Sequence, residues 1–149
     1  MAFGGTGNKG MWGKKRKKLA IALTCADWRL HQRKVDLNAR LAKLLGVAGV
    51  DLIAVPGPDG LIKPERKSEW QTAVAQIKLL NGAHAPRVVA VVAHQRCAGH
   101  PVTDGEHDMD VVATAKALKA ETGFTGPVRA IVAVYLSDTS WELKDIASF

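Results

Sequence analysis

The sequence predicts a single α/β domain with a mostly parallel, helix-flanked β-sheet. Short apolar runs, which are typical of strands buried on both faces, recur along the chain. Segments with apolar residues at helical spacing separate these runs. The chain has 149 residues, the length of one domain, and can bury a core without disulfides. Because strands that alternate with helices pair in parallel through right-handed crossovers, helices are expected on both faces of the sheet.

The first half of the domain is expected to contain two buried strands with a helix between them. The continuous apolar run at 19–24 suits a strand buried on both faces. A helix is expected at about 34–45, where leucines recur near helical spacing and Gly46 supplies a stop. Residues 51–55 form the second expected buried strand, and the prolines and glycines at 56–60 then predict a loop. The helix residues expected in the core are Leu41, Leu44 and Leu45.

The second half continues this alternation. A helix is expected at about 68–80, where a serine can cap the first turn and an Asn-Gly pair follows the last. Residues 88–93 form the clearest buried strand, and a polar loop leads from them to a helix at about 108–121, which a glycine closes. The strand at 128–136 ends the series, and residues 141–143 are expected to return as a short antiparallel edge.

Basic residues are concentrated near the N-terminus. Residues 14–18 are all Lys or Arg and supply five positive charges to a formal net charge of +7. Together with the glycine-rich residues before it, this run predicts a flexible tail at 1–18 and a folded domain at 19–149. The run from Lys14 to Lys18 can bind RNA, an acidic partner or a membrane surface, or can be a solvated tail with no partner.

The same basic run, followed by the apolar residues 19–24, imitates a secretory signal. The apolar stretch has six residues, fewer than the about 7–15 residues of a signal core. No stretch approaches the about 20 apolar residues of a membrane helix. We therefore expect a cytoplasmic protein.

Two short motifs follow two of the expected strands. Cys25, Asp27 and Arg29 come at the end of the first strand, and His94 and Cys97 follow the strand at 88–93. Ligands of open α/β sheets gather beyond the carboxyl ends of the strands, so the two motifs are placed to meet. In an extended segment, residues 25, 27 and 29 point to one side, and a tight turn can bring His94 and Cys97 onto one ion.

This set of side chains suits a metal. Two thiolates and one imidazole favour Zn²⁺, and three protein ligands leave the fourth position free for water. The two cysteines, Cys25 and Cys97, can alternatively form a disulfide or be ordinary buried thiols, and Asp27 and Arg29 can be a structural ion pair. The acidic, basic and imidazole groups beside the cysteines favour the metal.

Cys-x-Asp-x-Arg followed by His-x-x-Cys resembles the β-class carbonic anhydrases, and the resemblance extends from about Leu19 to Leu143. It implies a β-carbonic anhydrase-like zinc domain at 19–149. By this resemblance the zinc ligands are Cys25, His94 and Cys97, and the pair beside the metal is Asp27 with Arg29.

The resemblance also implies an activity, the reversible hydration of CO₂ to bicarbonate by a zinc-bound hydroxide. Asp27 is then expected to orient the hydroxide, and Arg29 to hold Asp27 by a bidentate pair. A homodimer or higher homo-oligomer is implied as well. Two alternatives stay open: hydrolysis of a CO₂ analogue, carbonyl sulfide or carbon disulfide, at the same site, and a zinc-holding interaction module without catalysis.

Further residues near the motifs have two interpretations each. His100 and His107 can shuttle protons or be ordinary loop histidines. Trp28 can form a wall of a substrate pocket or pack in the core. Gly57 and Gly60 resemble a phosphate cradle only weakly, because no dinucleotide-binding or P-loop pattern accompanies them.

Overall fold

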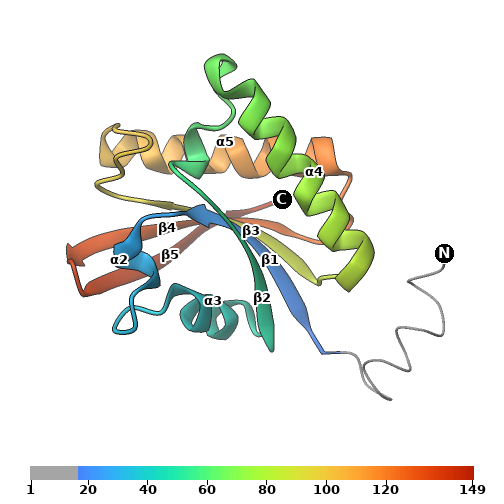
Figure 1. Ribbon diagram of the computed structural model, residues 1–149, viewed down its shortest axis with the longest axis horizontal. Helices are drawn as coiled ribbons and strands as arrows, with labels where there is room; N and C mark the ends of the chain where they lie inside the picture. Colours follow the sequence, from blue (N-terminus) through green and yellow to red (C-terminus); the bar gives the residue numbers. More distant parts are fainter. Residues whose placement is uncertain (1–16) are drawn as a thin grey trace.

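A five-stranded β-sheet forms the centre of the protein (Figure 1). The computed structural model describes residues 17–149, so the predicted tail lies outside the described residues except for its last two positions. The strand order is β2-β1-β3-β4-β5, in which the first four strands are parallel and β5 is antiparallel to β4. This confirms the predicted α/β fold. The strands are β1 (Leu19–Cys25), β2 (Gly49–Val55), β3 (Val88–His94), β4 (Val128–Ser137) and β5 (Ser140–Ser148).

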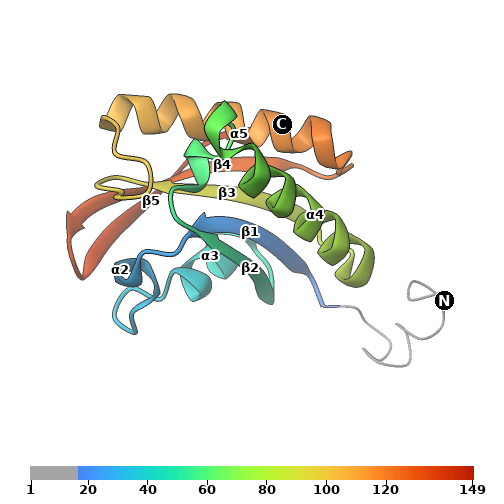
Figure 2. The same ribbon diagram turned by 45° about the horizontal axis from the view of Figure 1, so that its top comes forward.

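Helices cover both faces of the sheet, as right-handed crossovers require (Figure 2). Two long helices pack on one face and two short ones on the other, and each pair closes its own hydrophobic core. The first face carries α4 (Lys67–His84) and α5 (Asp104–Thr122), and the second carries α2 (Trp28–His31) and α3 (Leu37–Leu45). The loop after β2 contains two short 3₁₀ helices, η1 (Pro58–Gly60) and η2 (Pro64–Arg66).

Burial decreases from the middle of the sheet towards its edges. All seven residues of β3 are buried, and the first six are valines and alanines. The strand predicted at 51–55 is present, but the prediction that it is buried is wrong, because β2 is an edge strand in which only Ile53 is buried. An apolar run without alternation did not distinguish a central strand from an edge strand.

The helix predicted at 68–80 is longer than expected. It begins at Lys67, Ser68 does not cap it, and it continues past Gly82 to His84. It ends where Ala85 takes a left-handed conformation with a φ of 46°, just before a proline. The packing of the helix on the sheet therefore outweighed the local Asn-Gly stop signal.

Two other elements also extend beyond their predicted bounds. α5 begins at 104 instead of 108, because Thr103 and Glu106 form a capping box. It ends at Gly123, as predicted, with a φ of 65°. The edge predicted at 141–143 is one part of the longer strand β5, which pairs with β4 through a tight turn.

Two large apolar side chains lie on the surface. Leu44 was expected in the core but is 38% exposed, whereas Leu41 is buried and Leu45 is half-buried. Trp28 is 67% exposed, so the core interpretation of this residue is wrong. Among the helices at residues 17–149, none has the length and apolar character needed to span a bilayer.

Candidate metal centre

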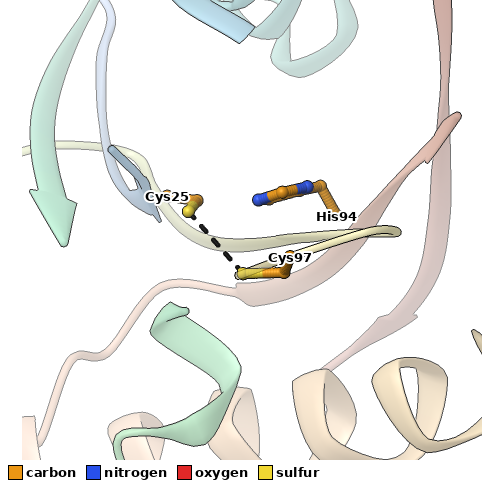
Figure 3. A group of neighbouring side chains, drawn as sticks. All are labelled: Cys25, His94 and Cys97. Carbon is orange, nitrogen blue, oxygen red and sulfur yellow. Dashed lines mark hydrogen bonds between the residues drawn. The ribbon is translucent and has the colours of Figure 1, made fainter. Parts of the chain in front are cut away.

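The structure brings Cys25, His94 and Cys97 together at the carboxyl edge of the sheet. Cys25 is the last residue of β1, His94 is the last residue of the neighbouring parallel strand β3, and Cys97 follows in the next turn. Their side chains point toward one another (Figure 3), and all three are buried. Since β1 and β3 pair in parallel, their ends meet at one edge, as the sequence argument required.

The spacing of the donor atoms fits a zinc ion. The Sγ atoms of Cys25 and Cys97 are 3.8 Å apart. Two Zn–S bonds of about 2.3 Å at a tetrahedral angle place two sulfurs about 3.8 Å apart. The ligand atoms of the three side chains all lie within 4.8 Å of one another.

His94 completes the group through the nitrogen that has no hydrogen bond. Its Nδ1–H donates to the carbonyl oxygen of Gln95 at 2.7 Å, which fixes the orientation of the ring. Its Nε2 is buried and has no hydrogen-bond partner among the described residues 17–149. A buried nitrogen without a partner costs stability unless a ligand satisfies it, so this atom supports a metal at the site.

The three groups change one another's protonation. The hydrogen bond from Cys97 is the largest cause that lowers the pKa of Cys25, and His94 adds to this effect while burial opposes it. The shared proton raises the pKa of Cys97. Burial by itself lowers the pKa of His94, but attraction to Cys25 raises it overall. One cysteine is therefore poised as a thiolate, the form that binds metal.

Asp27 and Arg29 form a bidentate ion pair next to this group. Arg29 Nη2 donates to Asp27 Oδ2 at 2.7 Å, and Arg29 Nε donates to Asp27 Oδ1 at 3.1 Å. Hydrogen bonds from Arg29 hold the pKa of Asp27 below its usual value. Asp27 Oδ2 lies 3.9 Å from His94 Nε2, so the carboxylate reaches the vicinity of the candidate metal.

Asp27 and Arg29 meet, but the prediction that an extended segment directs residues 25, 27 and 29 to one side is wrong. The chain is not extended through residues 25, 27 and 29, because Asp27 is the N-cap of α2 and accepts a hydrogen bond from the backbone N–H of Arg29. The Arg29 side chain folds back over the cap. Local capping, and not strand alternation, places the guanidinium on the carboxylate.

A backbone N–H group faces the sulfur of Cys25. Gly57 N–H donates to Cys25 Sγ at 3.5 Å. Gly57 has a φ of 56°, and a Cβ added there would lie 2.6 Å from the backbone of Gly99, so only glycine fits.

Aromatic and acidic residues from the far end of the chain complete the surroundings, and no sequence motif predicted their place here. The Trp141 ring meets His94 edge-on with ring centroids 5.6 Å apart. Asp138 lies 3.5 Å from Arg29, and the Tyr135 hydroxyl donates to Asp138. These residues lie in or beside the β4–β5 turn, which only the folded sheet brings to the end of β3.

A second polar group lies behind the loops and consists of Asp59, His100, His107 and Asp110; we call it the His–Asp cluster. His107 Nδ1 is 2.6 Å from Asp59 Oδ2, and His100 Nε2 is 2.6 Å from Asp110 Oδ2. His107 was expected in a loop but lies within α5 and is completely buried. Donor atoms of Asp59, His100 and Asp110 are also within 4.8 Å of one another, but spacings of 2.6 Å are those of hydrogen bonds.

The mostly parallel sheet with a Cys-His-Cys group and an Asp–Arg pair at its carboxyl edge defines a protein of the β-carbonic anhydrase-like fold class. A family model described as "Putative carbonic anhydrase" matches residues 15–147. The chain therefore belongs to this family. A search of the curated proteins found no significant match.

Proposed function

We propose that this protein is a zinc-dependent carbonic anhydrase that interconverts CO₂ and bicarbonate. The observation that carries the proposal is the spacing of the Cys25 and Cys97 sulfurs, 3.8 Å, beside the buried and unpartnered Nε2 of His94. These three residues would hold the zinc ion, and family membership supports the reaction. Zinc in such a site supplies Lewis acidity, which makes water a nucleophile near neutral pH.

Arg29 keeps the Asp27 carboxylate in one orientation. Three side-chain hydrogen bonds from Arg29 engage both carboxylate oxygens, and Arg29 is itself fixed by a 3.0 Å hydrogen bond from Nη2 to the Arg96 carbonyl oxygen. A carboxylate held in this way would be restrained from coordinating the metal itself. Arg29 is thus a positioning residue.

Asp27 is the proposed catalytic carboxylate. Its lowered pKa keeps it ionised at neutral pH, so it acts as an acceptor and not as a donor. Oδ1 already accepts from both the backbone N–H and the Nε of Arg29. Oδ2, which faces His94 Nε2 at 3.9 Å, is therefore the oxygen placed to accept a further hydrogen bond. Asp27 can therefore accept a hydrogen bond from the reacting water and direct its lone pair toward CO₂.

Metal content and CO₂ hydration, measured together, test the proposal. We expect about one zinc per chain and a hydration rate by stopped flow that rises from neutral to alkaline pH and disappears after chelation. Asp108→Asn, a change at an exposed position of α5, is the control and should behave like the wild type. A zinc-loaded protein that is inactive on CO₂ but releases H₂S from carbonyl sulfide would change the substrate. Inactivity on both substrates would favour the non-catalytic zinc module.

We also propose a homodimer or higher homo-oligomer, on the basis of family membership. β5 is an edge strand whose partner on one side is β4, and Leu136 and Ile146 near this edge are exposed. Apolar groups on an unpaired edge favour pairing with a second copy. Light scattering at micromolar concentration should give at least twice the mass of the chain, and a monomer at that concentration would contradict the proposal.

A further inference from the structure

Two short segments lie against the sulfurs of the candidate metal centre. The first is the loop at 56–60, in which Gly57 N–H donates to Cys25 Sγ at 3.5 Å. The second is the turn at 97–100, which carries Cys97 itself. A hydrogen bond to a thiolate draws electron density away from it, and the turn sets where the Cys97 sulfur lies, so the position of these segments affects how each sulfur donates to a metal.

The two segments are packed directly against each other. A Cβ on Gly57 would lie 2.6 Å from Gly99, and a Cβ on Gly60 would lie 2.7 Å from His100 Nδ1. The His100 ring is thus in contact with the loop as well as with its own turn. A shift of either segment must move the other, because no space separates them.

Helix α5 holds each segment through one His–Asp hydrogen bond. His107 on α5 bonds Asp59 in the loop, and Asp110 on α5 bonds His100 in the turn, each at 2.6 Å. Asp59 and His107 are completely buried, and the side chains of His100 and Asp110 are 10% and 19% exposed. The Thr114 hydroxyl, also on α5, donates to the Asp110 carbonyl oxygen at 2.7 Å and lies 3.3 Å from the Asp59 carbonyl oxygen.

The burial of this cluster is costly, which points to a role beyond stability. Asp59 Oδ1 and His107 Nε2 have no hydrogen-bond partner within residues 17–149. Well-packed apolar residues of the same volume often stabilise a core as much as a buried ionisable pair does, or more. The hydrogen bond between Asp59 and His107 supplies something that apolar packing does not, because it holds the loop at a defined distance from the helix.

We infer that the His–Asp cluster is a set of positioning residues that hold the Gly57 N–H against Cys25 and hold the turn that carries Cys97 in place, and thereby tune the metal that these cysteines bind. This inference rests on the proposed metal centre. None of the four residues touches the metal or the substrate. They act through the loop at 56–60 and the turn at 97–100.

Cobalt substitution tests the inference, because the sulfur-to-cobalt charge-transfer absorption reports on the thiolates directly. At His100, the Gln variant can place an amide donor near Asp110, whereas the Leu variant cannot. At His107, the Asn variant can keep a donor near Asp59 whereas the Leu variant cannot, so His107→Leu provides a second disruptive variant if His100→Leu folds poorly. Asp108→Asn is the matched control on the same helix. Zinc affinity and the pH profile of CO₂ hydration are measured on the same proteins.

We expect His100→Leu to shift the charge-transfer band and to weaken zinc binding by about 10–100-fold, with His100→Gln near the wild type. His107→Asn should follow His100→Gln. A folded His100→Leu protein with the wild-type band, zinc affinity and pH profile would overturn the inference. A second equivalent of cobalt that gives no sulfur-to-cobalt band and fails to bind to Asp110→Asn would also overturn the inference. The cluster would then itself be a metal site.

The outcomes also separate this inference from the proposed function. A wild-type protein that binds cobalt through sulfur but does not hydrate CO₂ rejects the activity, and the band of His100→Leu still decides the role of the cluster. A wild-type protein that binds no cobalt through sulfur rejects both.

Discussion

The Cys25–His94–Cys97 group and the His–Asp cluster lie near the same edge of the sheet, and both bury histidine. They differ in the spacing of their donor atoms. The two sulfurs are 3.8 Å apart, which leaves room for a cation between them, whereas the nitrogen and oxygen of each His–Asp pair are 2.6 Å apart. Two ligands bound at about 2.1 Å and at right angles around a metal lie about 3.0 Å apart. The spacing of the first group therefore fits a bound metal ion, and the spacing of the second fits hydrogen bonds.

The largest expected effect follows from this contrast. Cys25→Ser, His94→Ala and Cys97→Ser should each lose most of the bound zinc, because each removes one of three ligands. Asp59→Asn and Asp110→Asn should keep about one zinc per chain, measured by elemental analysis after dialysis. Equal metal loss in both sets of variants would remove the distinction between the two groups.

The second effect concerns the pair beside the metal group. Arg29→Ala frees Asp27 to coordinate the metal, and Asp27→Asn replaces the anionic acceptor by a neutral amide. Both variants should retain zinc and lose about 10²–10⁴-fold in CO₂ hydration, the usual contribution of a positioned acid–base group. Stopped-flow rates on zinc-loaded proteins measure this. Full activity in both variants would leave the Asp–Arg pair without a part in the reaction.

The sequence predicted the fold and the candidate ligands for a common reason. Cys25 and His94 directly follow apolar runs that the sequence identifies as strands, and parallel strands bring their carboxyl ends to one edge. The cluster was not predictable in this way. Asp59 and His107 are 48 positions apart, and their contact depends on the path of the loop after β2 and on the first residue of α5. No local pattern specifies either.

The third effect separates the two halves of the cluster by burial. His107→Leu leaves the completely buried Asp59 carboxylate unpaired and should cost about 3–5 kcal/mol of the free energy of unfolding. Asp110→Asn weakens a bond at a partly exposed site and should cost about 1 kcal/mol. Urea denaturation of the proteins compares them. Equal costs would show that burial does not distinguish the pairs.

The smallest expected effect is the pH dependence of stability that comes from Asp27. Hydrogen bonds from Arg29 lower the pKa of this carboxyl in the folded protein, while in the unfolded chain it titrates at about 3.9. The ionised form is therefore favoured by folding, and its contribution to stability is fully present above about pH 4. It is lost as the pH falls through the folded-state value, because the protonated carboxyl no longer pairs with Arg29.

The difference in free energy of unfolding between the wild type and Arg29→Ala, measured by urea denaturation with a chelator present, should shrink as the pH falls below about 4. Added salt should also reduce it, since Asp27 and Arg29 are both partly exposed. Arg129→Ala, at a partly exposed ion pair with Asp145 on the β4–β5 ribbon, is the matched control for removal of an arginine. A difference for Arg29→Ala that stays constant from pH 7 to pH 3 would mean that Arg29 stabilises the protein through its stacking near Tyr135 and Trp141 and not through the carboxylate of Asp27.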